Sequence, residues 1–177
     1  MAVNNVFENP KVWNESPVKM QARRPVLQGF VAAIFGLSAP ARAESTASVS
    51  NEVTATLRAF ITAFENLEWD TFRAAFADDA CVFHPSSKTP ERVCGRQAVE
   101  ASWRVVFDAT RQEARGGPPY QRLPLESIQV QVLDSAVAVV SFELKNEKRW
   151  GRRTVVFNKQ KGVWKIVHLH ASNFSLD

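Results

Sequence analysis

The sequence is short of the residues from which cofactor and nucleotide sites are usually built. Its 177 residues include only seven glycines and three histidines, and they contain no glycine-rich phosphate loop and no Gly-x-Ser-x-Gly nucleophile turn. The sequence has no triad of metal ligands either. We therefore expect neither a cofactor nor a bound metal. After residue 43, no apolar run is long enough and free enough of charge to span a bilayer.

A basic excess is also missing from most of the chain, although the formal net charge is +4. Residues 1–43 hold five of the 22 Lys and Arg residues and two of the 18 Asp and Glu residues, which leaves 17 bases and 16 acids for residues 44–177. A nearly neutral domain does not attract a phosphate backbone. We therefore expect no nucleic-acid partner.

The first 43 residues have the order of an export leader. Arg23 and Arg24 precede an apolar run over 26–37, and a small-x-small site ends at Ala43. This pattern predicts cleavage after Ala43, with residues 1–43 as the leader and 44–177 as the domain. The paired arginines resemble a twin-arginine signal, but a Sec signal can also carry them. The predicted location is periplasmic or secreted, or an organelle lumen in a eukaryote. The alternative is an amphipathic N-terminal helix of the folded domain.

Only two cysteines are present, Cys81 and Cys94. They lie 13 residues apart on either side of a turn-like Pro-Ser-Ser-Lys-Thr-Pro segment. An oxidising compartment permits a disulfide, and strands that pair across this turn could bring the two sulfur atoms together. The alternative is a pair of small buried apolar side chains.

Helical periodicity occupies the first part of the domain. It follows residues 44–51, which are small and polar and are expected to be flexible. Apolar residues at three- and four-residue spacing predict helices over 53–69 and 95–110, and a second short helix over 71–80 that ends at two aspartates. A short strand over 80–85 follows that second helix. The residues expected to face inward on the helices are Val53, Leu57, Phe60, Ile61, Phe64, Phe72, Ala75, Phe76, Val99, Trp103, Val106 and Phe107.

The period changes to two in the second part of the domain. Segments 126–134, 135–146, 148–160 and 162–174 alternate apolar and polar residues and are separated by turn residues. This order predicts an α+β fold in which three helices pack on one face of a curved antiparallel sheet with a four-stranded meander. The outer face is either solvated or paired with a second subunit, and apolar residues on both faces of the end strands favour a homodimer.

Two motifs carry a family resemblance that covers about residues 52–173. The last predicted strand reads Trp164-x-Ile166-x-His168-x-His170-x-Ser172 and resembles the SnoaL-like branch of the nuclear-transport-factor-like superfamily. Segment 60–85, with its Ala-Asp-Asp-Ala turn, is similar to the start of bacterial ketosteroid isomerase. The resemblance implies a cone-shaped fold around an apolar cavity. It does not imply one activity, because this fold serves isomerases, dehydratases, hydrolases, cyclases and proteins without catalysis.

His84 stands where the resemblance places the general base of the isomerase, at a strand end before Pro85. An imidazole titrates near neutrality and could accept a substrate proton or orient a ligand. The alternative is a structural histidine bonded to the backbone. Phe60 occupies the place of the tyrosine that donates to the oxyanion in the isomerase, and a phenyl ring cannot donate. We therefore do not expect steroid isomerisation.

The remaining candidate site residues are assigned by position. Phe60, Trp103 and Phe107 are expected to form both core and pocket wall, and Tyr120 the pocket mouth. Arg153 could bind an anion in a bidentate contact. The favoured interpretation is that it belongs with Arg149 and Arg152 to a solvated or interface face. His168 and His170 are expected to share a face with Trp164 and Ile166, as a hydrogen-bonding pair or, less favourably, a metal pair.

Three classes of function remain open. The first is an exported domain that binds an apolar small molecule without catalysis. The second is an isomerase, dehydratase or hydrolase with His84 as base. The third is an assembly or accessory module that uses the sheet as an interface. Two buried titratable groups that reach one point would favour the enzyme, and a pocket filled by side chains would favour assembly.

Overall fold

The computed structural model of the chain describes residues 39–85, 91–145 and 149–175. Most of the predicted leader and residues 86–90 of the predicted turn therefore lie outside the described residues. The elements in chain order are helices α1 (Ala39–Glu65) and α2 (Trp69–Ala74), strands β1 (Phe76–Phe83) and β2 (Val93–Cys94), helix α3 (Arg96–Glu113), and strands β3 (Leu125–Val132), β4 (Val137–Lys145), β5 (Arg149–Gln160) and β6 (Val163–Ser175). The predicted α+β class is confirmed.

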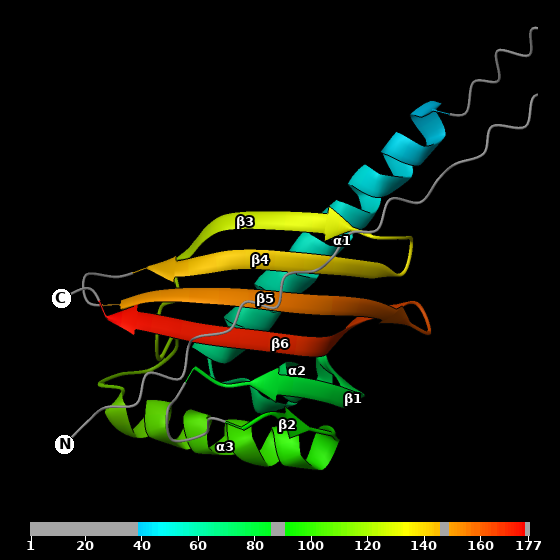
Figure 1. Cartoon of the computed structure of the whole chain (residues 1–177). Coiled ribbons are helices and arrows are strands. Elements are labelled where there is room, and N and C mark those ends of the chain that lie inside the picture. Colours follow the sequence, from blue (N-terminus) through cyan, green and yellow to red (C-terminus); the bar gives the residue numbers. More distant parts are fainter. Residues whose placement is uncertain (1–38, 86–90, 146–148, 176–177) are drawn as a thin grey trace, which may run out of the picture. The chain divides into compact units, whose positions relative to one another are not determined.

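The strands form one sheet in the order β2-β1-β6-β5-β4-β3. Strands β3 to β6 pair antiparallel, as the period-two segments predicted. The sheet extends further than the predicted meander, because β1 pairs parallel with β6 and β2 pairs antiparallel with β1. Figure 1 shows α1 running obliquely across one face of the sheet and α3 lying beside β1 and β2.

Two predicted element boundaries are wrong. Residues 44–51 are helical rather than flexible, since α1 begins at Ala39 and Val49 is buried against the core. The second helix ends at Ala74, and the two aspartates after it belong to β1. The carbonyl of Ala75 accepts a hydrogen bond from the amide of Ile166, so pairing with the distant β6 has replaced local helical bonding.

The core lies between the helices and one face of the sheet. Its fully buried members come from both layers: Val53 and Leu57 from α1, Phe72 from α2, Val99 from α3, and Val140, Val155, Phe157 and Ile166 from the sheet. We call this covered face the inner face. In the described part of the chain, no helix has both the length and the apolar character needed to cross a bilayer.

Candidate functional site

His84 lies at the end of β1 on the inner face. Val82 is fully buried there, and side chains two residues apart on a strand share a face. The imidazole ring is partly buried, with its centroid 4.7 Å from the ring of Trp103. Its Nε2 lies 2.9 Å from the hydroxyl oxygen of Ser102 on α3. Because this partner is a side chain, a histidine bonded only to the backbone does not describe His84.

The hydrogen bonds of Ser102 identify the tautomer of His84. The Ser102 hydroxyl donates its single proton to the carbonyl oxygen of Val99, at 2.8 Å. It must therefore accept from His84, so Nε2 carries the proton and Nδ1 keeps a lone pair. Burial lowers the pKa of His84 below 6.5, which favours this neutral form at neutral pH.

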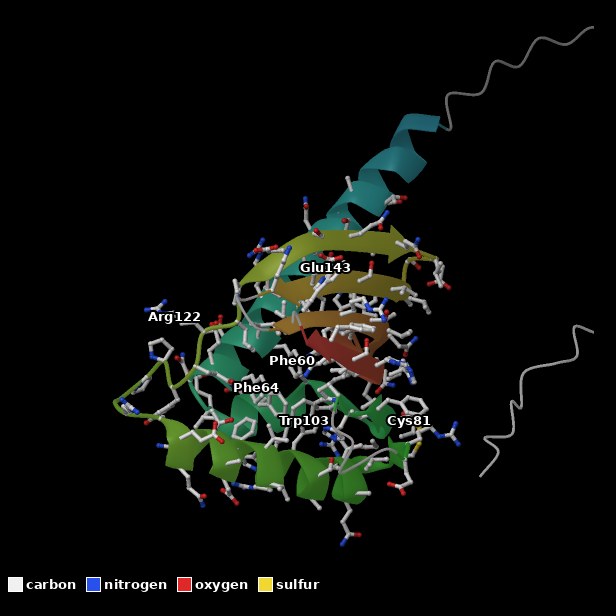
Figure 2. All side chains as sticks on the ribbon, turned by 60° about the vertical axis from the view of Figure 1, so that its left-hand side comes forward. Phe60, Phe64, Cys81, Trp103, Arg122 and Glu143 are labelled. Atoms are coloured by element: carbon white, nitrogen blue, oxygen red, sulfur yellow. A yellow bond between two sulfur atoms is a disulfide. The ribbon has the colours of Figure 1, made fainter. Side chains whose placement is uncertain are left out.

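The aromatic residues predicted as pocket wall pack against one another. Phe60, Trp103 and Phe107 are 5%, 7% and 5% exposed. Figure 2 shows Phe60, Phe64 and Trp103 gathered between α3 and the sheet. Phe72 lies at the centre of this cluster, with ring centroids 4.8 to 5.0 Å from those of Phe60, Phe107 and Trp103. The indole nitrogen of Trp103 is buried and donates to no acceptor among the described residues.

Arg153 extends from β5 on the inner face. It alternates with the buried Val155 and Phe157, whereas its neighbour Arg152 is exposed on the outer face. Its Nη1 donates to the carbonyl oxygens of Arg152 and Ser172, at 2.9 and 2.8 Å, and its Nη2 donates to Oδ1 of Asn173 at 3.0 Å. Burial lowers the pKa of Arg153 to about 10. Arg153 therefore does not share the exposed face of Arg152.

Gly151 makes room for the Arg153 guanidinium. A Cβ at position 151 would lie 3.0 Å from both Nη1 of Arg153 and Oδ1 of Asn173. Only glycine leaves this space without displacing one of them. The guanidinium thus has a fitted position at the sheet end, and none of its partners among the described residues is charged.

Strand register brings Arg153 and His84 into one row. Arg153 pairs with Ala171 on β6, and Phe83 pairs with His170, so His84 follows beside Ala171. The two backbones are two strand spacings apart, about 10 Å. The intervening side chain is a single methyl group. The inner face therefore presents a cation and a proton acceptor on either side of a small residue.

A β-bulge separates the C-terminal histidines from this row. Val156 pairs with His168 and Phe157 pairs with Ile166, which leaves Val167 as an extra residue in β6. Trp164 and Ile166 are buried, but His168 and His170 point to the outer face. The predicted shared face is therefore wrong, and these two histidines do not join the inner site.

The outer-face histidines lie near Phe83, whose ring centroid is 5.9 Å from that of His168 and 5.4 Å from that of His170. Burial, followed by repulsion from His170 and Arg92, lowers the pKa of His168. The described residues include no cluster of three or more potential metal ligands.

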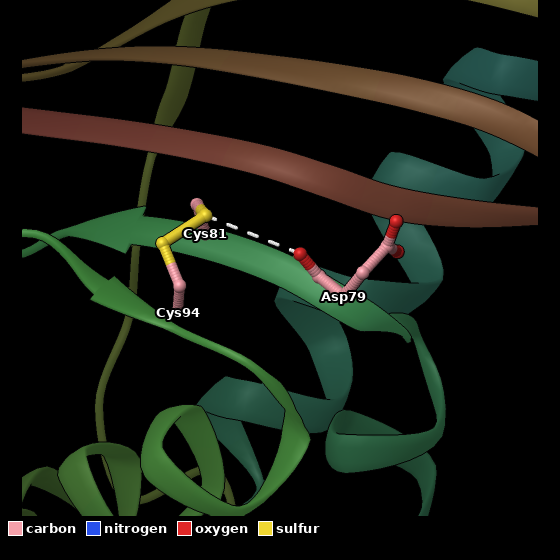
Figure 3. The surroundings of a disulfide bond; sticks show 3 residues. All are labelled: Asp79, Cys81 and Cys94. Carbon is pink, nitrogen blue, oxygen red and sulfur yellow. Dashed lines mark hydrogen bonds between the residues drawn. A yellow bond between two sulfur atoms is a disulfide. The ribbon is translucent and has the colours of Figure 1, made fainter.

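Cys81 and Cys94 are joined by a disulfide between β1 and β2 (Figure 3). The two residues are direct partners in the strand register, and their Cα atoms are 4.1 Å apart. The Sγ of Cys81 lies 4.0 Å from the carbonyl oxygen of Asp79. Since this sulfur is part of the disulfide, it carries no hydrogen and cannot donate a hydrogen bond. The bridge fixes Gly95 at the start of α3, where φ is +83° and glycine is favoured.

Tyr120 lies in the loop between α3 and β3, and its amide donates a hydrogen bond to the carbonyl oxygen of Glu65 at the end of α1. Its hydroxyl accepts a hydrogen bond from Nη1 of Arg111 at 2.8 Å, and the guanidinium also covers its ring. Arg111 is one wall of a pocket of about 240 Å³, which is lined by Leu67, Trp69, Arg104, Phe107, Asp108 and Arg111. Of the predicted pocket residues, only Phe107 lines this pocket, which we call the α2–α3 pocket.

Sequence reasoning missed Ser102, Gly151 and Asn173. A signal existed for Ser102, because it precedes the inward-facing Trp103 on a predicted helix. None existed for the other two, whose roles depend on how the Arg153 side chain folds back along its strand.

The comparisons agree with this architecture. Residues 53–176 match the family model described as SnoaL-like domain. No curated protein matches the sequence.

Solved structures share the fold at low sequence identity. An NTF2-like protein of unknown function from Pseudomonas putida has a TM-score of 0.59 at 21% identity, with 72% of this chain and 87% of that chain covered. A putative dehydratase of the NTF2-like family from Streptomyces avermitilis has a TM-score of 0.59 at 17% identity, with 72% and 97% covered. The association domain of CaMKII from C. elegans has a TM-score of 0.57 at 16% identity, with 73% and 98% covered.

Proposed function

The chain belongs to the SnoaL-like domain family, and from this premise we propose that it is an exported domain that binds a small molecule with an apolar part and an anionic group. The fold serves both binding and catalysis in different proteins, so the assignment depends on the site rather than on the family.

The observation that carries the proposal is Arg153. Its guanidinium is buried enough to lower its pKa, and its partners are two carbonyl oxygens and an amide oxygen. No carboxylate of the described residues forms an ion pair with it. A partly buried cation without a counter-ion favours an anionic ligand, and a guanidinium binds carboxylate or phosphate in a bidentate fork.

The rest of the ligand would meet apolar and neutral groups. Phe142 is the partner of Arg153 on β4 and is 4% exposed, and Ala171 separates Arg153 from His84. Nδ1 of His84 can accept a hydrogen bond from the ligand. These surroundings support an amphipathic molecule rather than a polar one.

Native mass spectrometry of protein purified from the exported fraction tests the proposal. We expect the wild-type protein to retain a small molecule, and R153Q to lose it. R152Q is the matched control, because Arg152 is the adjacent residue and lies exposed on the outer face. Equal retention by R153Q and R152Q would contradict the proposed role of Arg153.

A specific observation also favours catalysis as a second candidate. Nδ1 of His84 is an unprotonated acceptor held in place by Ser102, and its lowered pKa suits a base that works near neutral pH. H84Q would preserve a hydrogen-bonding side chain but cannot transfer a proton. Ligand bound by H84Q but converted only by the wild type would support the enzyme. Identical retention and no conversion in both proteins would favour binding alone.

The partner proposal is a homodimer through the outer face, with an assembly or accessory role as its alternative. The mutual packing of the aromatic residues predicted as pocket wall favours this assembly class. Trp150 and Phe174 are direct partners on β5 and β6 and are 37% and 45% exposed. Each lies beneath a cation, Lys145 over Trp150 and Arg152 over Phe174. Exposed aromatic residues next to arginine are typical of interfaces.

A further inference from the structure

The α2–α3 pocket combines an apolar floor with a charged rim, and neither His84 nor Arg153 lines it. We infer that it is a second binding site, for a small aromatic carboxylate. This inference goes beyond the ligand proposed for the inner face and does not depend on it.

The floor of the pocket is apolar and fixed. Leu67 and Phe107 are 7% and 5% exposed, so only their outer atoms contribute to the wall. The indole of Trp69 stands edge-on to Phe107, with ring centroids 5.2 Å apart. The guanidinium of Arg104 covers that indole at 3.7 Å from its centroid. Arg104 thus covers one face of the indole, so a flat apolar group would pack on Leu67, Phe107 and the part of Trp69 that Arg104 leaves open.

The rim is built from one side of α3. Arg104, Asp108 and Arg111 are spaced by four and three residues, which places them on the same helical surface. None of the three belongs to an ion pair in the described segments of the chain. Arg111 uses one donor on Tyr120, and a guanidinium has five. Both arginines therefore retain donors for a ligand.

The charge of the rim selects the kind of anion. Two guanidinium groups and one carboxylate leave one positive charge, which a monoanion neutralises. The Asp108 carboxylate would repel the second charge of a phosphate monoester. A carboxylate, by contrast, fits the planar fork of either guanidinium. The rim thus favours a carboxylate over a dianion.

The backbone supports the same assignment. Leu67 has a φ of +54°, a left-handed conformation that glycine adopts far more readily than a branched residue. Hydrogen bonds from its own amide to Phe64 and from the amide of Glu68 to Ala63 hold this turn after α1. Glycine would relax the turn but remove part of the floor. Leu67 is a member of the buried core, and its remaining exposed edge forms part of the floor.

The size fits one ring with a short acidic group. A buried cavity of about 150 Å³ holds benzene in an engineered protein. The α2–α3 pocket, at about 240 Å³, has room for a carboxylate in addition. A molecule such as benzoate would place its ring on the floor and its carboxylate between the two arginines.

Benzoate is the probe, and the indole N–H signal of Trp69 in a ¹⁵N-labelled protein is the readout. We expect benzoate to shift this signal saturably and benzyl alcohol, its neutral counterpart, to bind at least about tenfold more weakly. R104Q and R111Q should each raise the dissociation constant of benzoate by about tenfold. R115Q is the matched control, since Arg115 is an exposed residue just after α3.

Three outcomes would overturn the inference: no saturable shift of the Trp69 signal with benzoate, equal binding of benzyl alcohol, or equal loss in R115Q. R153Q separates this site from the inner one. If the Trp69 response persists in R153Q, the α2–α3 pocket binds on its own. If R153Q removes the response while R104Q keeps it, benzoate acts through the inner face and the second site is wrong.

Discussion

Nε2 of His84 lies 2.9 Å from the hydroxyl oxygen of Ser102, and this contact joins the end of β1 to the middle of α3. Since Ser102 donates to Val99, His84 is the donor in the pair. The bond therefore holds both the tautomer and the orientation of the imidazole. Any role of His84 as an acceptor depends on Nδ1, the nitrogen that this bond leaves unprotonated.

The lowered pKa of His84 predicts a pH dependence of stability. Burial disfavours the imidazolium in the folded state, so the unfolded chain binds a proton more readily just below pH 6.5. The stability contributed by the neutral imidazole is complete above that value and is lost as the pH falls below it. The free energy of unfolding should therefore drop more in the wild type than in H84Q between about pH 7 and about pH 5.

The other histidines provide the control for this measurement. The pKa of His168 is also lowered, chiefly by burial, so its contribution has the same sign. H168Q should remove that part and leave the part due to His84. An NMR titration of the three histidines would assign each contribution directly. A wild-type curve parallel to that of H84Q would contradict the burial argument.

The Cys81–Cys94 disulfide predicts a redox dependence of stability. The bond closes a loop with a sequence separation of 13, and constraining a loop of that size in the unfolded chain stabilises the native state by about 3 kcal/mol. Denaturation of the oxidised protein should therefore be compared with and without a reductant. C94A should resemble the reduced wild type and be insensitive to the reductant. A reductant effect of equal size in C94A would show that the bond is not its cause.

The elements that sequence predicted correctly are those set by local periodicity. The alternation of β3 to β6 and the apolar stripe of α3 depend on residues close in the chain, and both were confirmed. The sequence also allowed a prediction of which face of β5 each arginine occupies. Arg153 lies two residues before the apolar Val155 and four before Phe157, whereas Arg152 falls on the opposite face.

The wrong predictions concern segments whose conformation is set by pairing with residues far away in the sequence. The sequence of β6 alternates without interruption from Trp164 to His170. Pairing with β5, however, creates a bulge at Val167, which turns His168 and His170 to the outer face. Asp78 and Asp79 resemble the end of a helix in the sequence. They lie in a strand instead, because β1 pairs with the distant strand β6, for example Cys81 with His168. The left-handed turn at Leu67 has no sequence signal, because leucine disfavours it.

The predicted cleavage of the leader after Ala43 would remove the first residues of α1. The core residues that α1 is seen to supply, by contrast, run from Val49 to Ala63. A protein of residues 44–177 should therefore unfold with nearly the same free energy as the full chain. N-terminal sequencing of exported protein should give Glu44. A first residue near Met1 would contradict export by this leader and weaken the oxidising context assumed for the disulfide.

The proposed homodimer predicts that charge on the outer face separates the subunits. Trp150 and Phe174 are exposed partners at one end of β5 and β6, and a glutamate at either position would bring an unpaired charge into the interface. We expect W150E and F174E to be monomeric in light scattering at concentrations where the wild type is dimeric. V105E is the matched control, because Val105 is a 70% exposed apolar residue on α3, outside the sheet. The helical position should tolerate the charge and leave the dimer intact. A wild type that remains monomeric at high concentration, or a dimer disrupted by V105E and not by W150E, would contradict an interface on the outer face.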